Sequence, residues 1–102
     1  MPQSVLEGLC ASRTDITGAA YVEASGLALA SAGPRAHEAQ KAGTEALDML
    51  KPKERLTLEA EQGWVLAERL EDGDLLLVLT DAAPNLGGLL AEVQRCCSLL
   101  SR

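Results

Sequence analysis

The stretch that most limits the possible folds of this sequence is LLLVLT at residues 75–80, which is apolar at almost every position. It follows EDGD at residues 71–74, and an Asp-Gly pair is a strong signal for a tight hairpin turn. A half-buried strand alternates apolar and polar residues, whereas a strand that is apolar on both faces must be covered above and below. The run therefore predicts a central strand with helices packed on both faces of its sheet.

Other segments show the period-two alternation that is typical of strands. A turn at Gly26 joins the first two of them, and we expect Leu27 and Leu29 of the second to lie in the core. Because the connections are mostly short hairpins, the sheet should be antiparallel. The alternating segments are residues 16–22, 27–32, 54–61 and 64–70.

Two segments in the first half of the chain indicate helices. Ser4 and Glu7 have the spacing of a capping box, which predicts a helix of about two turns near the start. Residues 34–51 lie between two prolines and predict a longer helix, with Pro34 in its first turn and Pro52 as the stop. Its buried stripe is rich in small residues: Ala36, Ala39, Gly43, Ala46, Leu47 and Leu50.

A last helix is expected to begin at Ala83–Asn85. Its apolar face should consist of Leu86, Leu89, Leu90, Val93, Cys97 and Leu100. The complete order is then α-β-β-α-β-β-β-α. The chain is predicted to form one α+β domain over residues 1–102, a five-stranded antiparallel sheet with helices on both faces.

The stretch EASGLALASAG at residues 23–33 allows two interpretations, a phosphate-binding loop or a hairpin. A dinucleotide loop lies between a strand and a helix and offers backbone N–H groups to phosphate. Here Gly26 lies between two alternating segments, and Gly33 is followed by Pro34, which has no N–H. The hairpin interpretation is therefore favoured, and no cofactor is predicted.

The residues with reactive side chains form no recognisable catalytic or metal-binding arrangement. His37 shares a predicted helix face with Lys41 and other polar residues, so it is expected to be solvated. Cys96 and Cys97 point about 100° apart on a helix and cannot share a metal comfortably. Cys97 is expected in the core and Cys96 at the surface. The prediction is that the chain is not an enzyme.

The alternation in residues 54–61 places Leu56, Leu58 and Ala60 inward and the polar residues outward. Carboxylates are frequent in this region and the two strands after it. A catalytic pair needs a desolvated cleft, and strand alternation favours a solvated acidic face instead. These carboxylates are Glu59, Glu61, Glu68, Glu71, Asp72 and Asp74.

The overall charge narrows the choice of partners. A formal net charge of −6 argues against nucleic acid and against anionic membrane, because both need a basic surface. The N-terminus lacks the basic and apolar regions of a signal peptide, and the longest apolar run is far shorter than a membrane span. Three cysteines give no disulfide framework, so the cytoplasm is the expected location.

Taken together, these segments resemble the Roadblock family, also called dynein light chain 7-like, over nearly the whole chain. The most specific piece is the acidic-x-x-Gly-Leu-x-Leu-Ala-Ser pattern at residues 23–31. The alanine-rich helix follows it, then LTLEAEQGWVLAERLEDGDLLLVLT for three strands and PNLGGLLAEVQR for the last helix. The resemblance implies a five-stranded antiparallel sheet with one helix on one face and two on the other.

The resemblance also implies a homodimer in which the middle helices pack together and the third strands pair into one continuous sheet. The interface residues carried over by this resemblance are Ala42, Leu47, Met49, Leu50, Arg55, Thr57 and Glu59. The same apolar residues could instead be ordinary core.

The family that the sequence resembles consists of regulators and scaffolds of small Ras-like GTPases and of dynein-associated light chains. Some bacterial members activate a partner GTPase as homodimers. The resemblance therefore implies a non-catalytic homodimeric regulator of a small Ras-like GTPase. Two alternatives remain: a structural adaptor that leaves GTP turnover unchanged, and a ligand-sensing module with an apolar pocket.

Overall fold

The computed structural model describes residues 2–82 and 84–101. In this part of the chain the elements follow the predicted order α-β-β-α-β-β-β-α. The helices are α1 (Pro2–Ser12), α2 (Ala36–Leu47) and α3 (Leu86–Leu100). The strands are β1 (Ile16–Val22), β2 (Ala28–Ala32), β3 (Arg55–Ala60), β4 (Gly63–Arg69) and β5 (Leu75–Thr80). Ala83, which was expected at the start of the last helix, lies outside the described residues.

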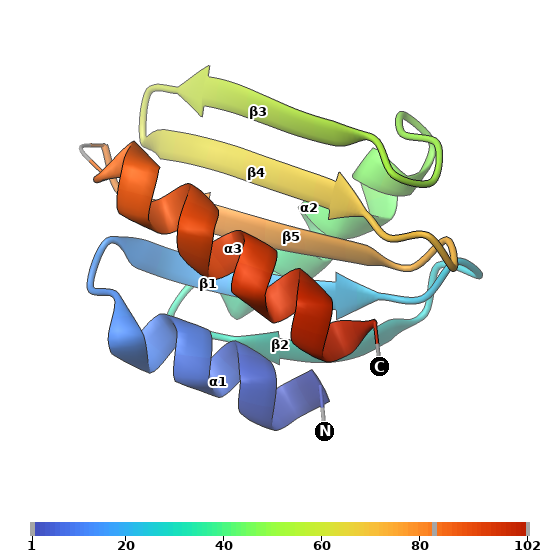
Figure 1. The fold of residues 1–102 in the computed structure, drawn as a ribbon. Coiled ribbons are helices and arrows are strands. Elements are labelled where there is room, and N and C mark those ends of the chain that lie inside the picture. Colours follow the sequence, from blue (N-terminus) through green and yellow to red (C-terminus); the bar gives the residue numbers. More distant parts are fainter. Residues whose placement is uncertain (1, 83, 102) are drawn as a thin grey trace.

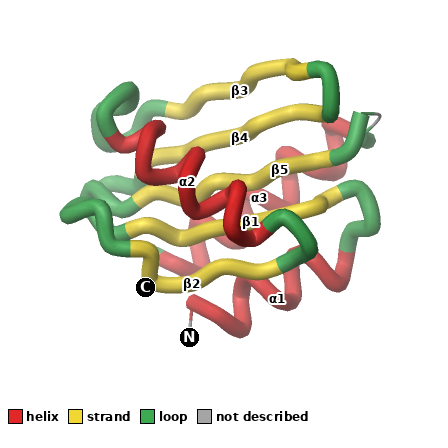
Figure 2. Tube along the Cα trace, turned by 180° about the vertical axis from the view of Figure 1, so that it is seen from behind, coloured by secondary structure: helices red, strands yellow, loops and turns green. Residues whose placement is uncertain are grey.

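The strands form one antiparallel sheet in the order β2-β1-β5-β4-β3. Figure 1 shows α1 and α3 on one face, and Figure 2 shows α2 on the other. β5 lies in the middle and all six of its residues are buried, so the prediction from LLLVLT is confirmed. The sheet and its two helical layers also confirm the predicted fold class.

Two apolar clusters hold the layers together. On one face, Leu6 and Leu9 of α1 and Leu89 and Val93 of α3 pack against the sheet. On the other face, the small-residue stripe of α2 packs on β1, β5 and β4, as predicted. Gly43 lets α2 approach the sheet closely, because a Cβ atom there would lie 2.8 Å from Cγ2 of Val22.

The prediction for the first helix was wrong in its starting point. The helix begins at Pro2, so Ser4 lies inside α1 and cannot act as an N-cap. Pro2 suits a first helical turn because its missing N–H has no intrahelical acceptor there. Likewise α2 begins at Ala36 and ends at Leu47, so Pro34 and Pro52 flank it from outside.

The predicted core positions in β2 were also wrong. Leu27 is 61% exposed and Leu29 is 42% exposed, whereas Ala30 and Ala32 are buried against α1. Alternation separates two sets of side chains but does not say which set meets a helix. α1 lies close to β2 (Figure 1), and the alanines are the set that faces it. The turn at Gly26 is confirmed, with a φ of 98°.

Candidate interaction surface

β3 forms one edge of the sheet, and five of its six residues are exposed. The N–H of Arg69 donates to the carbonyl oxygen of Glu54 at 2.9 Å, so the Glu54 carbonyl is directed toward β4, just before the paired residues Arg55 and Glu68. Successive residues of a strand direct their backbone groups to opposite sides. Residues 56, 58 and 60 therefore direct their backbone groups toward β4. Arg55, Thr57 and Glu59 direct theirs toward the open edge.

On the α2 side of this edge lies an exposed apolar patch. Leu58 is 48% exposed, although alternation predicted it inward, and Ala60 is exposed as well. Leu56 is half-buried and packs against the apolar cluster between α2 and the sheet, called the α2 cluster below. Met49, just beyond the end of α2, is 62% exposed. The alternation was correct in phase, but α2 crosses β1 and β5 and leaves β3 uncovered (Figure 2).

The opposite side of β3 is polar. Nη2 of Arg55 lies 3.0 Å from Oε1 of Glu68 on β4, and Nε2 of Gln94 on α3 donates to the same oxygen at 3.0 Å. Glu68 is largely buried, whereas the Arg55 side chain is more than half exposed. The guanidinium of Arg55 therefore has N–H donors left to contact a further carboxylate from outside the edge.

Arg69 fixes the end of α2 beside this surface. Its Nη1 donates to the carbonyl oxygens of Leu47 at 3.2 Å and Leu50 at 2.7 Å, and its Nε donates to that of Gly73 at 2.8 Å. A cation at a helix C-terminus satisfies carbonyls that lack intrahelical partners. Sequence reasoning missed this role, because Arg69 is adjacent to α2 only after β4 is in place.

The other edge of the sheet is covered at Ser31. The side-chain amide of Gln3 on α1 donates to the carbonyl oxygen of Ser31 on β2 at 2.7 Å and accepts from the Ser31 N–H at 3.2 Å. Gln3 thus occupies the backbone groups that an added strand would use. The two edges of the sheet differ in this respect, since β3 carries no such cover in the described chain.

The structure gathers the predicted interface residues at one corner, formed by the end of α2 and by β3. Leu47 and Leu50 are buried, and Ala42 is half-buried in the α2 cluster. The remaining predicted residues are exposed: Met49, Arg55, Thr57 and Glu59. Their contact with a second copy stays a prediction. Leu58 was assigned to the core, and the open edge adds it to the candidate surface.

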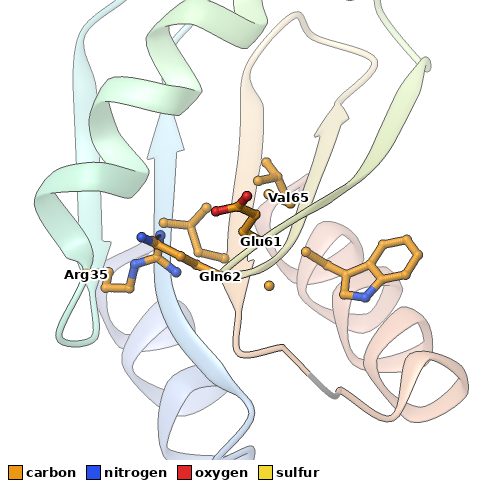
Figure 3. Close-up of a pocket in the computed structure, with 8 residues that line it drawn as sticks. Arg35, Glu61, Gln62 and Val65 are labelled. Carbon is orange, nitrogen blue, oxygen red and sulfur yellow. Dashed lines mark hydrogen bonds between the residues drawn. The ribbon is translucent and has the colours of Figure 1, made fainter.

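A shallow cavity of about 320 Å³ lies where the start of α2 meets the β3–β4 turn. Figure 3 shows Arg35 and Gln62 side by side at its rim. The Arg35 guanidinium donates to Oε2 of Glu38 at 2.9 Å, Oγ1 of Thr17 at 3.3 Å and Oε1 of Gln62 at 3.5 Å. These contacts tie α2 to β1 and to the turn, so the arginine has a structural role.

The candidate reactive groups lie apart. His37 is exposed, as expected, and Cys97 is buried, as expected. Cys96, which was expected at the surface, is only 1% exposed because α1 lies beside α3. Burial raises the pKa of Cys10, Cys96 and Cys97, which disfavours the reactive thiolate. Among the described residues, no group of three or more His, Cys, Asp or Glu is placed to hold a metal ion.

The geometry thus defines an α+β fold with one open sheet edge. No protein-family model matches the sequence, and no curated protein matches it. Solved structures do match. A Roadblock/LC7 domain from Streptomyces avermitilis has a TM-score of 0.81 at 13% identity, over 97% of this chain and 93% of that one. The chain therefore has the Roadblock/LC7 fold, which confirms the resemblance.

Two further solved structures have the same fold. MglB from Myxococcus xanthus has a TM-score of 0.76 at 15% identity and covers 97% of this chain and 90% of that one. The gliding protein MglB from Thermus thermophilus has a TM-score of 0.69 at 14% identity, over 94% of this chain and 82% of that one.

None of the helices in the described residues has the length and apolarity of a membrane span.

Proposed function

We propose that this chain is a non-catalytic, cytoplasmic homodimer that regulates or scaffolds a small Ras-like GTPase. The fold shared with MglB supports the proposal, together with the sequence resemblance to a family of GTPase regulators. The acidic net charge of −6 suits a partner with a basic surface.

The main evidence for the proposed dimer is the contrast between the two edges of the sheet. β3 offers free backbone groups beside exposed Leu58 and Met49, whereas Gln3 covers the backbone of Ser31 on β2. An uncovered edge with apolar side chains is a template for strand pairing. A second copy bound at β3 would cover the edge and the apolar patch together. The proposed interface therefore consists of the residues implied by the resemblance together with Leu58.

Dimerisation is tested with Met49→Glu and Leu58→Glu. Both side chains are exposed in the single chain, so these variants should fold and run as monomers in light scattering coupled to gel filtration. Leu27→Glu is the matched control, because Leu27 is equally exposed but lies at the other end of the sheet. It should remain a dimer. A wild-type monomer at micromolar concentration would contradict the proposal.

The proposed GTPase partner is tested by mixing the protein with Ras-like GTPases encoded near its gene, each loaded with GDP or with a GTP analogue. Binding with a changed hydrolysis rate supports a regulator. Binding without any change in rate favours the alternative, a structural adaptor in a larger complex. Absence of binding in both nucleotide states contradicts the proposed partner.

A further inference from the structure

We propose that two copies pair their β3 strands antiparallel about Thr57, so that Arg55 of each chain lies opposite the partner's Glu59. The inference rests on the homodimer proposed above and specifies its register. Its evidence is the direction of the backbone groups along β3 and the order of charged and apolar side chains on the strand.

Backbone geometry limits the possible registers. A hydrogen-bonded antiparallel pair sets outward-directed residues of one strand opposite outward-directed residues of the other. In β3 the outward-directed residues are Arg55, Thr57 and Glu59, which are every second position of the strand. When such residues pair with each other in a symmetric dimer, the twofold axis passes through a residue position and never between two adjacent residues. Centring the axis on Thr57 aligns residues 54–60 of both chains. Centring it on Leu58 moves Arg55 opposite the partner's Glu61, which lies in the turn beyond the strand.

The side chains favour the register centred on Thr57. On the polar face, each Arg55 meets the partner's Glu59, and these pairs form twice by symmetry. On the other face, each Leu58 meets the partner's Leu56, which covers the leucine that the single chain leaves 48% exposed. Opposite charges and apolar pairs directly across two strands stabilise them, whereas like charges destabilise them.

Arg55 is suited to bridge the two chains. It already contacts Glu68 at 3.0 Å, and its side chain is 57% exposed, so its remaining N–H groups are accessible. Glu59 is exposed and has no ion pair within the described chain. In the dimer, each guanidinium would lie between Glu68 of its own β4 and the partner's Glu59. This row of alternating charges would specify the register.

Charge reversal tests the register. Arg55→Glu alone sets Glu opposite Glu twice, and Glu59→Arg alone sets Arg opposite Arg twice. Each variant should therefore have a dimer dissociation constant at least about tenfold above that of the wild type. A mixture of the two single variants restores both attractive pairs, so a heterodimer should predominate in native mass spectrometry. The double variant carrying both changes should dimerise more tightly than either single variant, although Glu at position 55 then faces Glu68 of its own chain.

Glu61→Arg is the control that separates the two registers. On its own, this variant should dimerise like the wild type. When mixed with Arg55→Glu, it should not form a heterodimer. If Glu61→Arg, rather than Glu59→Arg, rescues Arg55→Glu, the axis lies at Leu58 and the proposed register is wrong while the dimer stands. If neither reversal weakens the dimer, the β3 pairing itself is contradicted. A monomeric wild type contradicts the dimer as well.

Crosslinking gives a second test that does not depend on charge. With Thr57→Cys the two introduced sulfurs face each other across a hydrogen-bonded pair, with Cα atoms about 5.5 Å apart, which permits a disulfide. Leu58→Cys should not crosslink, because its Cα atoms would lie farther apart than the ~7 Å that a disulfide spans. Oxidised glutathione is the oxidant, and the wild type with its three native cysteines is the blank. A crosslink at 58 without one at 57 overturns the register.

Discussion

The side chain of Gln3 pairs with the backbone of Ser31 as a neighbouring strand would. Its amide donates to the Ser31 carbonyl at 2.7 Å and accepts from the Ser31 N–H at 3.2 Å. One residue of α1 thus covers the outer edge of β2 at Ser31. Because β3 at the opposite edge stays open, the proposed strand addition would be directed to one side of the sheet, and assembly through that edge would close at two copies.

Gln3→Ala should reopen the β2 edge. We expect oligomers larger than the dimer to appear as concentration rises, because both edges can then pair. The free energy of unfolding should fall by about 1 kcal/mol, the net value of one or two exposed hydrogen bonds. Light scattering coupled to gel filtration measures the first effect and urea unfolding the second.

Gln40→Ala is the matched control for that experiment. Nε2 of Gln40 donates to the side-chain oxygen of the same Ser31 at 2.7 Å, but it does not contact the backbone edge. It should leave the oligomeric state unchanged. Equal oligomer growth in both variants would contradict a specific edge-closing role for Gln3.

Gly43→Ala should destabilise the fold although alanine is the better helix former. The new Cβ would lie 2.8 Å from Cγ2 of Val22, and β-branched valine has little freedom to turn away. Overpacking of this kind costs about 1–3 kcal/mol, and the gain in helix propensity of about 1 kcal/mol only partly offsets it. We expect a net loss of about 1 kcal/mol in urea unfolding.

Two variants check that explanation. Gly8→Ala in α1 meets nothing within 4 Å, so it should stabilise the protein by up to about 1 kcal/mol. Val22→Ala should make the cost of Gly43→Ala smaller, because it removes the methyl group that the new Cβ meets. Additive effects of the two substitutions would contradict the contact.

Tyr21 should titrate at an unusually high pH. Burial raises its pKa, and its hydroxyl donates to Oδ2 of Asp74 at 2.7 Å, which raises the pKa further. The chain has a single tyrosine, so tyrosinate absorbance reports this residue alone. In the folded protein the absorbance change should come well above pH 10, the value of a free tyrosine. A midpoint near pH 10 would contradict it.

The same shift predicts how Tyr21→Phe responds to pH. A raised pKa contributes stability below about pH 10 that is lost as the pH rises toward the folded value. Tyr21→Phe should therefore be less stable than the wild type by about 1–2 kcal/mol at pH 7. Above pH 10 the difference should shrink by about 1.4 kcal/mol per pH unit. Urea unfolding at pH 7 and at alkaline pH measures both.

Asp15 should contribute stability that disappears in acid. Arg13 donates to its carboxylate at 2.7 and 3.0 Å and the N–H of Asn85 donates at 3.2 Å, which lowers the pKa of Asp15. A lowered pKa gives stability above about pH 4 that is lost as the pH falls through the folded value. Asp15→Asn should lose stability at pH 7, and the difference from wild type should vanish in strong acid.

A double-mutant cycle with Arg13→Gln tests the cause of the Asp15 effect. Because the two side chains form one pair, the double variant should lose less stability than the sum of the single variants. Additive losses would show that Asp15 acts through Asn85 alone.

Hydrophobic periodicity was sufficient to predict much of the fold. LLLVLT predicted the central strand, and EDGD predicted the β4–β5 turn, where Gly73 has a φ of 96°. The stripe of α2 from Ala39 to Leu47 is buried as its spacing predicts. Each of these signals is local, since a strand that is apolar on both faces or a helix stripe specifies burial without reference to the rest of the chain.

The sequence alone thus determined the order of the elements and the two-faced burial of β5. Only the tertiary structure decided which face of an alternating strand is covered. Ala30 lies under α1 while Leu29 is exposed, and Cys96 is buried by α1 while Leu90 is exposed. It also brought Gln3 to Ser31, 28 residues away, and left β3 open. The physical reason is that periodicity is a property of one segment, whereas the covering of a face or an edge depends on where a distant helix packs.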